Sequence, residues 1–413
     1  MTAEAPEPDA SPEPEPTPLL QPADGVPELT IYDDQIAAAA DRLAAGHGPF
    51  AVDAERASGF RYSGRAYLIQ IRRAGAGTVL LDPVSGGGDP VVSLRPIADV
   101  LAGGEWILHA ADQDLPCLAE VGMRPAALYD TELAGRLAGY DRVNLAAMVQ
   151  RLLGLGLAKG HGAADWSKRP LPQAWLNYAA LDVEVLIDLR DAVAAVLAGQ
   201  GKTQWAAQEF EHLRTLPATP TRRDRWRRTS GIHKVRDARG LAEVRELWTT
   251  RDQIARRRDI APGRILPDSA IIDAALADPG TVEDLTALPV FGGSRQRRNA
   301  DLWLAALARG RDNPEPPTPP DPQNGPPPVA RWSRRKPEAA ARLEASRAAL
   351  TEVSEQVHVP TENLLAPDLL RRLCWEWEGA DDIPEAIEAF VRDRGARPWQ
   401  RELVVPVLAQ ALA

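Results

Sequence analysis

The sequence predicts an α/β domain built on a mixed sheet and followed by two small all-α bundles. Short apolar runs bounded by Gly, Pro and Asp occupy the first part of the chain and are typical of strands. Helical periodicity without strand alternation characterises the chain beyond residue 238. With 413 residues, 44% of them hydrophobic and 26% charged, the chain is long enough for two or three domains.

The first domain is expected over residues 28–215. Four apolar runs predict strands, at residues 49–55, 66–72, 78–83 and 105–110. The first three runs follow one another with short connections, which favours an antiparallel start to the sheet. Five segments predict helices, at residues 91–104, 113–122, 130–139, 144–154 and 173–197. Helices packed on such a sheet make an α/β domain.

Two helical bundles are expected over residues 239–311 and 331–413. The first has helical runs at residues 241–258, 268–277 and 300–310, and the second repeats the plan at residues 337–357, 358–377, 381–395 and 401–413. The Pro-rich segment 312–330 between them predicts a semi-rigid spacer. Before the first bundle, residues 216–238 are expected to form a basic linker, because arginines cluster around Trp226 where the apolar periodicity lapses.

Residues 1–27 combine prolines with acidic residues and offer almost nothing to bury, so a disordered tail is expected. The net charge of the chain is -10, which by itself argues against a phosphate-bearing partner, since phosphate binding needs cations. Six of the negative charges belong to the tail, which has no Lys or Arg. The net charge therefore does not exclude a nucleic-acid substrate.

Membrane insertion and secretion are not expected. No run approaches the roughly 18 to 20 apolar residues that span a bilayer, and the acidic N-terminus lacks the plan of a signal peptide. Cys117 and Cys374 lie far apart and form no metal-binding pattern, so a cytoplasmic protein is expected. Residues 199–203, GQGKT, resemble a phosphate loop, but that pattern requires Gly at position 196, where the chain has Val, so no ATP site is expected.

Asp53 and Glu55 lie two residues apart at the end of the first predicted strand, AVDAE. Side chains at this spacing project from the same face of a sheet. Two carboxylates on a half-buried strand repel each other unless a positive charge lies between them, and oxygen ligands suit Mg²⁺ or Mn²⁺. The pair indicates either a divalent metal site or two solvent-exposed acids.

Three further residues occur where they could converge on this pair. Asp114 follows the strand at 105–110 and opens a helix, where an N-cap is its alternative role, and Asp112 is a rival for the same position. Tyr178 and Asp182 lie four residues apart and share one face of the helix at 173–197. A core tyrosine beside a solvated acid is the alternative for that pair.

The segments AVDAE, HAADQDLPCL and WSKRPLPQAWLNYAALDVEVLIDL resemble, in order and spacing, the three exonuclease motifs of the ribonuclease D family. This family belongs to the DEDD superfamily with a ribonuclease H-like fold, in the variant whose third motif is Tyr, three residues, Asp. The resemblance covers residues 28–215. The family usually has Thr at the position of Ala54, a departure that concerns the surroundings of the metal site more than its ligands.

The resemblance implies that four carboxylates bind two divalent metal ions, Mg²⁺ or Mn²⁺: Asp53, Glu55, Asp114 and Asp182. Tyr178 would orient the attacking water, and the spacing from His109 favours Asp114 over Asp112. A further set falls in family-like contexts and is expected to contact substrate or brace the site: Gln70, His109, Lys159, Asp165 and Arg169. For Gln70, Lys159, Asp165 and Arg169 the alternative is an ordinary polar residue at the surface.

The two helical bundles resemble HRDC domains, the first closely and the second more loosely. The resemblance implies that they hold nucleic acid near the active site. Six arginines are candidates for phosphate contacts: Arg256, Arg257, Arg258, Arg295, Arg297 and Arg298. Trp226 and Trp248 are candidates for base stacking, although a tryptophan in an apolar helical stripe is more often part of the core.

The resemblance, supported by the carboxylates and the tyrosine, implies a metal-dependent 3′-5′ exoribonuclease that trims single-stranded 3′ ends of structured RNA, such as tRNA precursors, and releases nucleoside 5′-monophosphates. Hydrolysis assisted by two metal ions does not distinguish ribose from deoxyribose, so a 3′-5′ DNA exonuclease is an alternative. The second alternative is a non-catalytic RNA-binding protein with a vestigial site. The intact acids and tyrosine argue against it.

Overall fold

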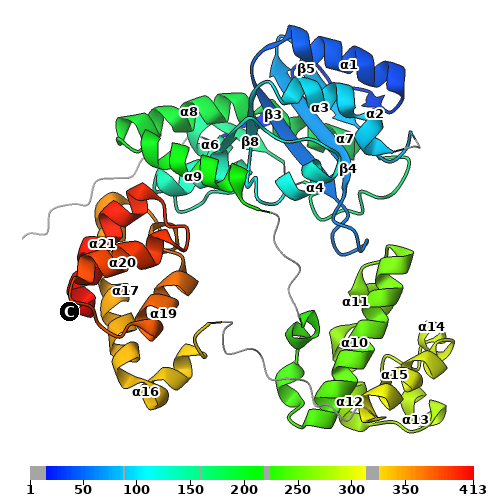
Figure 1. Ribbon diagram of the computed structural model, residues 1–413. Coiled ribbons are helices and arrows are strands. Elements are labelled where there is room, and N and C mark those ends of the chain that lie inside the picture. The colour runs from blue at the N-terminus through cyan, green and yellow to red at the C-terminus, as the bar shows by residue number, and fades with distance from the viewer. Residues whose placement is uncertain (1–14, 87–88, 159, 218–223, 313–324) are drawn as a thin grey trace, which may run out of the picture.

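The computed structural model describes residues 15–86, 89–158, 160–217, 224–312 and 325–413 (Figure 1). An α/β unit comes first, and two helical units follow it along the chain. Within these described ranges, no helix has the length and apolar content needed to cross a membrane.

A six-stranded mixed sheet forms the centre of the α/β unit. Its strands run in the order β2-β5-β4-β3-β6-β7. Their bounds are Leu29–Thr30 for β2, His47–Arg56 for β3, Ala66–Ala74 for β4, Gly77–Leu81 for β5, Glu105–Leu108 for β6 and Ala127–Asp130 for β7. The pairs β3-β4 and β4-β5 are antiparallel, whereas β6 and β7 add to β3 in parallel. The mixed sheet and its antiparallel start are therefore confirmed.

Helices cover both faces of the sheet, because strand β3 is apolar on both sides. Val52 and Ala54 face a core shared with α1 (Asp33–Ala45), α3 (Arg95–Leu101) and α4 (Leu115–Glu120). Ala51 faces the opposite core. That face is covered by α5 (Thr131–Leu137), α6 (Leu145–Leu153), α7 (Gln173–Glu184), α8 (Leu186–Gly199) and α9 (Thr203–Thr215). The short helix α2 (Pro90–Ser93) precedes α3. The helix expected over residues 173–197 is divided at Val185 into α7 and α8.

The predicted disordered tail is wrong for residues 15–27, while residues 1–14 lie outside the described residues. Strand β1 (Thr17–Leu19) pairs in parallel with β8 (Leu155–Leu157). Leu19 packs against the main core, and the Asn177 side-chain amide donates to the Leu20 carbonyl at 2.9 Å. Partners supplied by distant segments order this stretch, and its own composition gives no sign of them.

The first helical unit contains α10 (Ala238–Arg258), α11 (Pro262–Ile265), α12 (Asp268–Ala277), α13 (Val282–Thr286), α14 (Ser294–Arg297) and α15 (Ala300–Asp312). Two 3₁₀ turns, Arg225–Arg228 and Ile232–Lys234, precede α10. Trp226 and Val235 lie in the core of this unit. The expected linker over residues 216–238 is therefore wrong from residue 224 onward, because two of its apolar side chains are needed in that core.

The C-terminal unit contains α16 (Trp332–Arg335), α17 (Pro337–Val357), α18 (Thr361–Leu364), α19 (Pro367–Glu376), α20 (Ile383–Arg392) and α21 (Pro398–Leu412), after a 3₁₀ turn at Val329–Arg331. It repeats the start of the first unit, because in both a helix of 21 residues is followed by helices of 4 and 10 residues. Both long helices end at a residue with left-handed backbone, Asp259 and His358. The two units therefore share the lengths of these three helices, and the helix expected over residues 358–377 is divided into α18 and α19.

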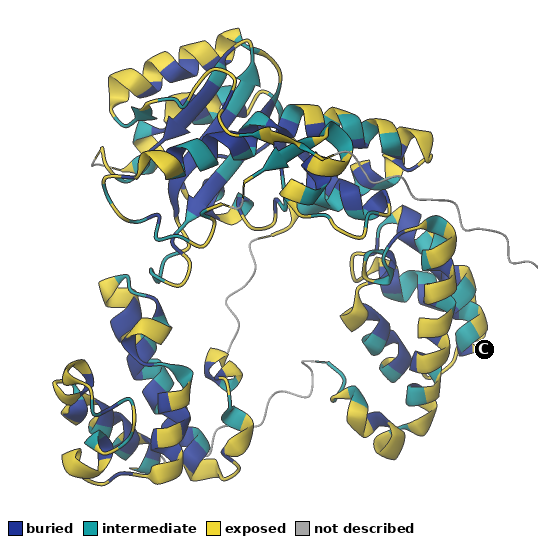
Figure 2. Cartoon of the chain, turned by 180° about the vertical axis from the view of Figure 1, so that it is seen from behind, coloured by how far each residue is buried: buried dark blue, intermediate teal, exposed yellow. Residues whose placement is uncertain are grey.

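Both helical units contact the α/β unit. The apolar core of the C-terminal unit is continuous with the core beneath α8 and α9, and Figure 2 shows buried residues on both sides of this junction. The first helical unit contacts the loop between β3 and β4, where the Asp259 carboxylate accepts the Ser63 backbone N–H at 2.8 Å. Residues 159, 218–223 and 313–324 lie outside the described residues.

Candidate active site

Three carboxylates converge where β3 meets α7. Oxygen atoms of Asp53, Glu55 and Asp182 all lie within 4.8 Å of one another. The alternation of β3 directs Asp53 and Glu55 to the face that α7 covers, and α7 places Asp182 above them. The cavity beside them has a volume of about 280 Å³ and is lined by Asp53, Asp182 and residues that include His109, Leu157, Gly160 and Tyr178.

Asp114 lies next to this trio at the start of α4. Its side chain makes no hydrogen bond to the end of the helix, so the alternative N-cap role is not seen. Only 5% of Asp114 is exposed, and the negative charge of Asp53 acts on it. Asp112, its rival, is exposed. The geometry therefore favours Asp114 as the fourth carboxylate of the cluster.

Tyr178 lies one helical turn before Asp182, and the two side chains are close enough for each to shift the pKa of the other. Its ring is packed among aromatic side chains, with ring centroids 5.8 Å away at His161 and 6.5 Å away at Trp166. Gly160 lies against the same ring, so closely that a Cβ atom there would lie 1.6 Å from the Tyr178 Cε2 atom. These neighbours fix the direction of the phenol.

Burial and mutual repulsion hold protons on the cluster. Burial raises the pKa of Asp53 to about 6, and burial together with the charges of Asp53 and Asp182 raises the pKa of Glu55 to about 10. The pKa values of Asp114 and Asp182 are also raised, first by burial and then by Asp53. Burial likewise raises the pKa of Tyr178, so its hydroxyl keeps its proton at neutral pH.

Two of the residues expected to contact substrate lie beside the cluster. Gln70 is directly opposite Asp53 in the β3-β4 register and shares its face of the sheet. It is fully buried, and neither atom of its amide has a hydrogen-bond partner among the described residues. His109 lines the cavity, and its Nδ1 atom lies 2.9 Å from the Thr131 hydroxyl. Burial lowers the pKa of His109 to about 4, so the imidazole is neutral at pH 7.

Arg169 braces the unit instead of pointing toward a ligand. Its guanidinium pairs with the buried Asp82 carboxylate through contacts of 2.7 and 2.8 Å, and the same group donates to the backbone carbonyls of Tyr67, Trp166 and Lys168. Asp165 accepts a hydrogen bond from the Ser167 hydroxyl. Of the two roles expected for Arg169, the structure supports bracing. Lys159 lies outside the described residues.

Sequence reasoning missed Asp130, which organises the segment leading to Asp114. Its carboxylate accepts the backbone N–H groups of Ala110 and Ala111 at 3.2 and 2.8 Å, and also caps the first turn of α5. Ala110 has a φ of 61°, a conformation that a residue with a Cβ adopts only when its surroundings enforce it. An Asp followed by Thr and Glu at the start of a helix signals the cap, but nothing local signals the second role.

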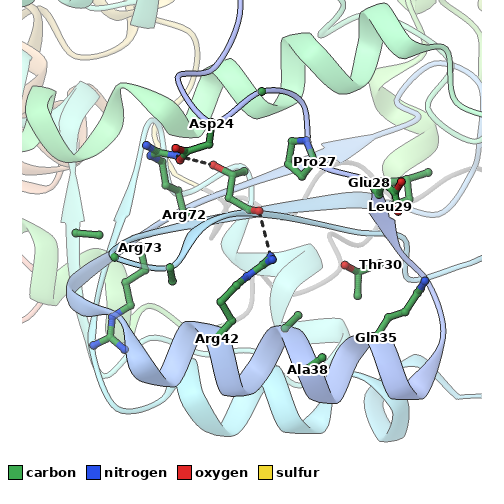
Figure 3. Close-up of a pocket in the computed structure, with 17 residues that line it drawn as sticks. Asp24, Pro27, Glu28, Leu29, Thr30, Gln35, Ala38, Arg42, Arg72 and Arg73 are labelled. Atoms are coloured by element: carbon green, nitrogen blue, oxygen red, sulfur yellow. Dashed lines mark hydrogen bonds and ion pairs between the residues drawn. The ribbon is translucent and has the colours of Figure 1, made fainter.

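A larger cavity, of about 860 Å³, lies elsewhere in the α/β unit, between residues 24–30, α1 and the β4-β5 turn (Figure 3). Its arginines are occupied by the protein itself. Arg72 pairs with Asp24 at 3.2 Å and with Glu184 at 2.9 Å, and Arg42 donates to the Thr78 carbonyl at 3.4 Å. None of the carboxylates of the cluster lines this cavity.

Three family models match the chain. The model described as 3′-5′ exonuclease matches residues 29–198, and the HRDC domain model matches residues 241–307. The model described as 3′ to 5′ exonuclease C-terminal domain matches residues 325–412. The HRDC resemblance is thus confirmed for the first helical unit. The second helical unit matches the model of the exonuclease C-terminal domain instead.

Known proteins resemble the chain over most of its length. Ribonuclease D of Nitrobacter hamburgensis is 32% identical over 76% of this chain and 77% of that protein. Ribonuclease D of Granulibacter bethesdensis is 30% identical over 74% and 75%. Among solved structures, a protein from Bifidobacterium adolescentis has a TM-score of 0.86 and 37% identity, covering 96% of this chain and 100% of that one. Escherichia coli RNase D, described as an exoribonuclease involved in structured RNA processing, has a TM-score of 0.67 and 25% identity, covering 93% of this chain and 98% of that one.

Proposed function

The chain belongs to the ribonuclease D family, and from this we propose that it is a metal-dependent 3′-5′ exoribonuclease that releases nucleoside 5′-monophosphates. One observation carries the proposal beyond the family: the carboxylates of Asp53, Glu55 and Asp182 converge within 4.8 Å, with Asp114 and the Tyr178 hydroxyl beside them. Buried acids in such proximity are costly unless cations join them.

The residues fit two divalent metal ions. All four ligands are carboxylates, a set that suits Mg²⁺ or Mn²⁺, and four negative charges formally match two such ions. The buried Gln70 amide opposite Asp53 supports an additional polar occupant, because its unpaired donor and acceptor need partners. When bound, two such metals activate a water molecule and stabilise the charge on the leaving 3′ oxygen.

The protein groups then have distinct tasks. Asp53, Glu55, Asp114 and Asp182 hold the ions, and Tyr178 directs the attacking water through its hydroxyl. Because its raised pKa keeps the phenol protonated, Tyr178 acts as a hydrogen-bond donor and not as a base. Neutral His109, at the wall of the cavity, is available as a hydrogen-bond partner for the terminal nucleotide.

The substrate we infer is RNA with a single-stranded 3′ end, such as a tRNA precursor. The cavity of about 280 Å³ at the carboxylates is small, which favours one extended strand over a duplex. The structural likeness to Escherichia coli RNase D supports structured RNA as the class from which such ends are trimmed. Both cysteines are buried thiols, which supports a cytoplasmic location.

We infer that both helical units are HRDC-type modules that hold RNA near the site. The repeated helix lengths of 21, 4 and 10 residues support this for the C-terminal unit. In the first unit, six exposed arginines are available to phosphates: Arg256, Arg257, Arg258, Arg295, Arg297 and Arg298. Trp226 is buried and therefore not available for stacking, and Trp248 is partly buried beneath Arg225.

The test is incubation of a 5′-labelled RNA carrying a single-stranded 3′ extension with the full chain and Mg²⁺ or Mn²⁺. A ladder that shortens from the 3′ end with release of nucleoside monophosphates is expected, and chelation or Asp53→Asn should abolish it. A matched DNA substrate separates RNA from DNA specificity, because only contacts to the 2′-hydroxyl favour RNA. Full activity of Asp53→Asn would contradict the mechanism, and RNA binding without any release would instead indicate a binding protein.

A further inference from the structure

Arg56 places a cation directly against the carboxylate cluster. It is the last residue of β3, and its Nη2 atom lies 3.6 Å from Asp114 Oδ1 and 3.3 Å from Gln113 Oε1. The register between β3 and β4 shifts between Glu55 and Arg56, so the strand ends irregularly at this point. Arg56 therefore reaches Asp114 from the end of the strand that carries Asp53 and Glu55.

The Arg56 guanidinium is only partly used by the protein. Its side chain is 29% exposed, whereas that of Asp114 is 7% exposed. Among the described residues, the hydrogen bonds of this guanidinium involve Nη2 alone, which leaves Nε and Nη1 to other partners. Arg169 differs, because each nitrogen of its guanidinium donates to a protein acceptor. The Arg56 guanidinium therefore has donors available for a ligand, whereas the Arg169 guanidinium is fully engaged by the protein.

Charge matching identifies the kind of ligand. Four carboxylates and two divalent cations sum formally to zero, so Arg56 adds a positive charge directly beside a site that holds both ions. A phosphodiester brings one negative charge to the same place. A planar guanidinium is well suited to the oxygens of phosphate, and such charge-assisted hydrogen bonds are among the strong ones.

We propose that Arg56 is a further catalytic residue of this site, whose guanidinium binds a non-bridging oxygen of the scissile phosphodiester while Asp114 holds it at the rim. The proposal rests on the proposed function. In this proposal the positive charge that offsets the incoming phosphate belongs to the protein. Arg56, the residue that follows Glu55, becomes a contact to the substrate.

The alternative is that Arg56 merely holds Asp114 in place. The two roles predict opposite effects on metal binding. If Arg56 is a phosphate-binding cation, its removal relieves repulsion toward a metal ion, so Mn²⁺ should bind more tightly. If Arg56 only positions Asp114, its removal loosens a metal ligand, so Mn²⁺ should bind more weakly and excess metal should restore activity.

The experiment compares the full chain with Arg56→Met, Arg56→Lys and the control Arg95→Met. Arg95 is an exposed arginine on α3 that pairs with Asp99. The measurements are Mn²⁺ binding by titration calorimetry, binding of a 5′-fluorescein-labelled oligoadenylate with Ca²⁺ in place of Mg²⁺, and kcat and KM on the same oligoadenylate with Mg²⁺.

For Arg56→Met we expect kcat/KM to fall by about 10- to 100-fold, the range given by one charge-assisted hydrogen bond, and oligoadenylate binding to weaken. Mn²⁺ binding should tighten, Arg56→Lys should be intermediate, and Arg95→Met should match the wild type. Unchanged kinetics in Arg56→Met, or a loss that excess Mn²⁺ fully restores, would overturn the proposal. An inactive wild type would instead refute the proposed function.

Discussion

At the residue scale, the carboxylate cluster holds protons that a metal ion must displace. Burial raises the pKa of Asp53 to about 6, and burial together with neighbouring negative charges raises the pKa of Glu55 to about 10. Metal affinity should therefore rise with pH as Asp53 and then Glu55 lose their protons. These raised pKa values also mean that the metal-free fold loses stability as pH rises from about 4 through 6 and above, since the carboxylates then ionise where burial deprives them of hydration and, at Glu55, where acidic neighbours repel them.

The linked proton release is measurable. Titrations of Mn²⁺ in two buffers of different ionisation enthalpy at pH 7 should give different apparent heats, in proportion to the protons released. In Glu55→Gln, which has one titrating carboxylate fewer, the release should be smaller. Equal heats in both buffers would show that the carboxylates are already ionised without metal.

Gly160 permits the position of Tyr178. In Gly160→Ala the new Cβ would lie 1.6 Å from the Tyr178 ring, so the ring or the loop must move. We expect kcat to fall about tenfold or more with little change in KM, because the direction of the hydroxyl matters most during the reaction. Gly199→Ala is the matched control, since no atom lies within 4 Å of a Cβ there. Equal kcat values in the two variants would show that Tyr178 tolerates displacement.

At the element scale, Asp130 connects the start of α5 to the turn before α4. Asp130→Ala removes the acceptor for Ala110 and Ala111 as well as a helix cap. We expect a loss of about 2 to 4 kcal/mol in the free energy of unfolding, together with weaker metal binding through Asp114. Asn144→Ala, which removes only the cap of α6, should cost about 1 kcal/mol and leave metal binding unchanged. Denaturant unfolding and Mn²⁺ titration measure both effects.

Elements with a strong local pattern were predictable from sequence, and elements that depend on distant partners were not. Strands β3, β4, β5 and β6 and the long helices appear close to their expected residues, because their periodicity reports the cores that they face. Strand β1 lies in a segment of prolines and acids and exists only because β8 supplies its backbone partners. The sequence predicts a linker where the 3₁₀ turns before α10 lie, because Trp226 is surrounded by arginines in sequence, whereas in the structure it packs into a core.

The residues of the candidate site also fall into two groups, those predictable from local spacing and those that depend on distant partners. Asp53 with Glu55, and Tyr178 with Asp182, follow from strand and helix spacing. The resemblance to a family selected Asp114, and the structure adds the reason, since Asp114 is buried beside Asp53 while Asp112 is exposed. The second role of Asp130 was not accessible, because its partners Ala110 and Ala111 lie about 20 residues away on another segment.

At the scale of the whole molecule, the C-terminal unit is joined to the α/β unit by a partly buried ion pair. Glu209 on α9 receives two hydrogen bonds from the Arg397 guanidinium, at 2.6 and 2.8 Å, and one from the Trp399 indole at 2.7 Å. The Trp399 ring also stacks on Trp205 with centroids 4.9 Å apart. The C-terminal unit should therefore unfold together with the α/β unit.

Removing Glu209 should separate these units. In Glu209→Ala the Arg397 charge remains partly buried without its partner, so we expect a loss of about 3 to 5 kcal/mol and two thermal transitions in place of one. Glu211→Ala is the matched control on the same helix, because its pair with Arg214 is exposed and contributes little. Calorimetry that shows a single, unshifted transition for Glu209→Ala would mean that apolar packing alone joins the units.

The first helical unit is attached to the α/β unit through the loop that follows Glu55. Asp259, at the end of α10, accepts the Ser63 N–H at 2.8 Å and the Tyr67 hydroxyl at 3.3 Å, and lies 3.6 Å from the Arg65 guanidinium. These contacts fix an HRDC-matching module to the β3-β4 loop, a few residues beyond Glu55. An RNA bound to this module, as proposed above, would therefore lie near the carboxylates.

Asp259→Gly tests this attachment without disturbing the helix end. Asp259 has a φ of 47°, which Gly adopts readily, so the variant loses the carboxylate but keeps the backbone. We expect the radius of gyration measured by X-ray scattering to increase, and kcat/KM to fall on a long structured RNA but not on a short oligoadenylate, because only the long substrate reaches both the module and the site. Asp273→Gly, at an exposed position within α12, controls for general loss of stability in the same unit. An equal fall on both substrates would instead place the effect of Asp259 in the active site.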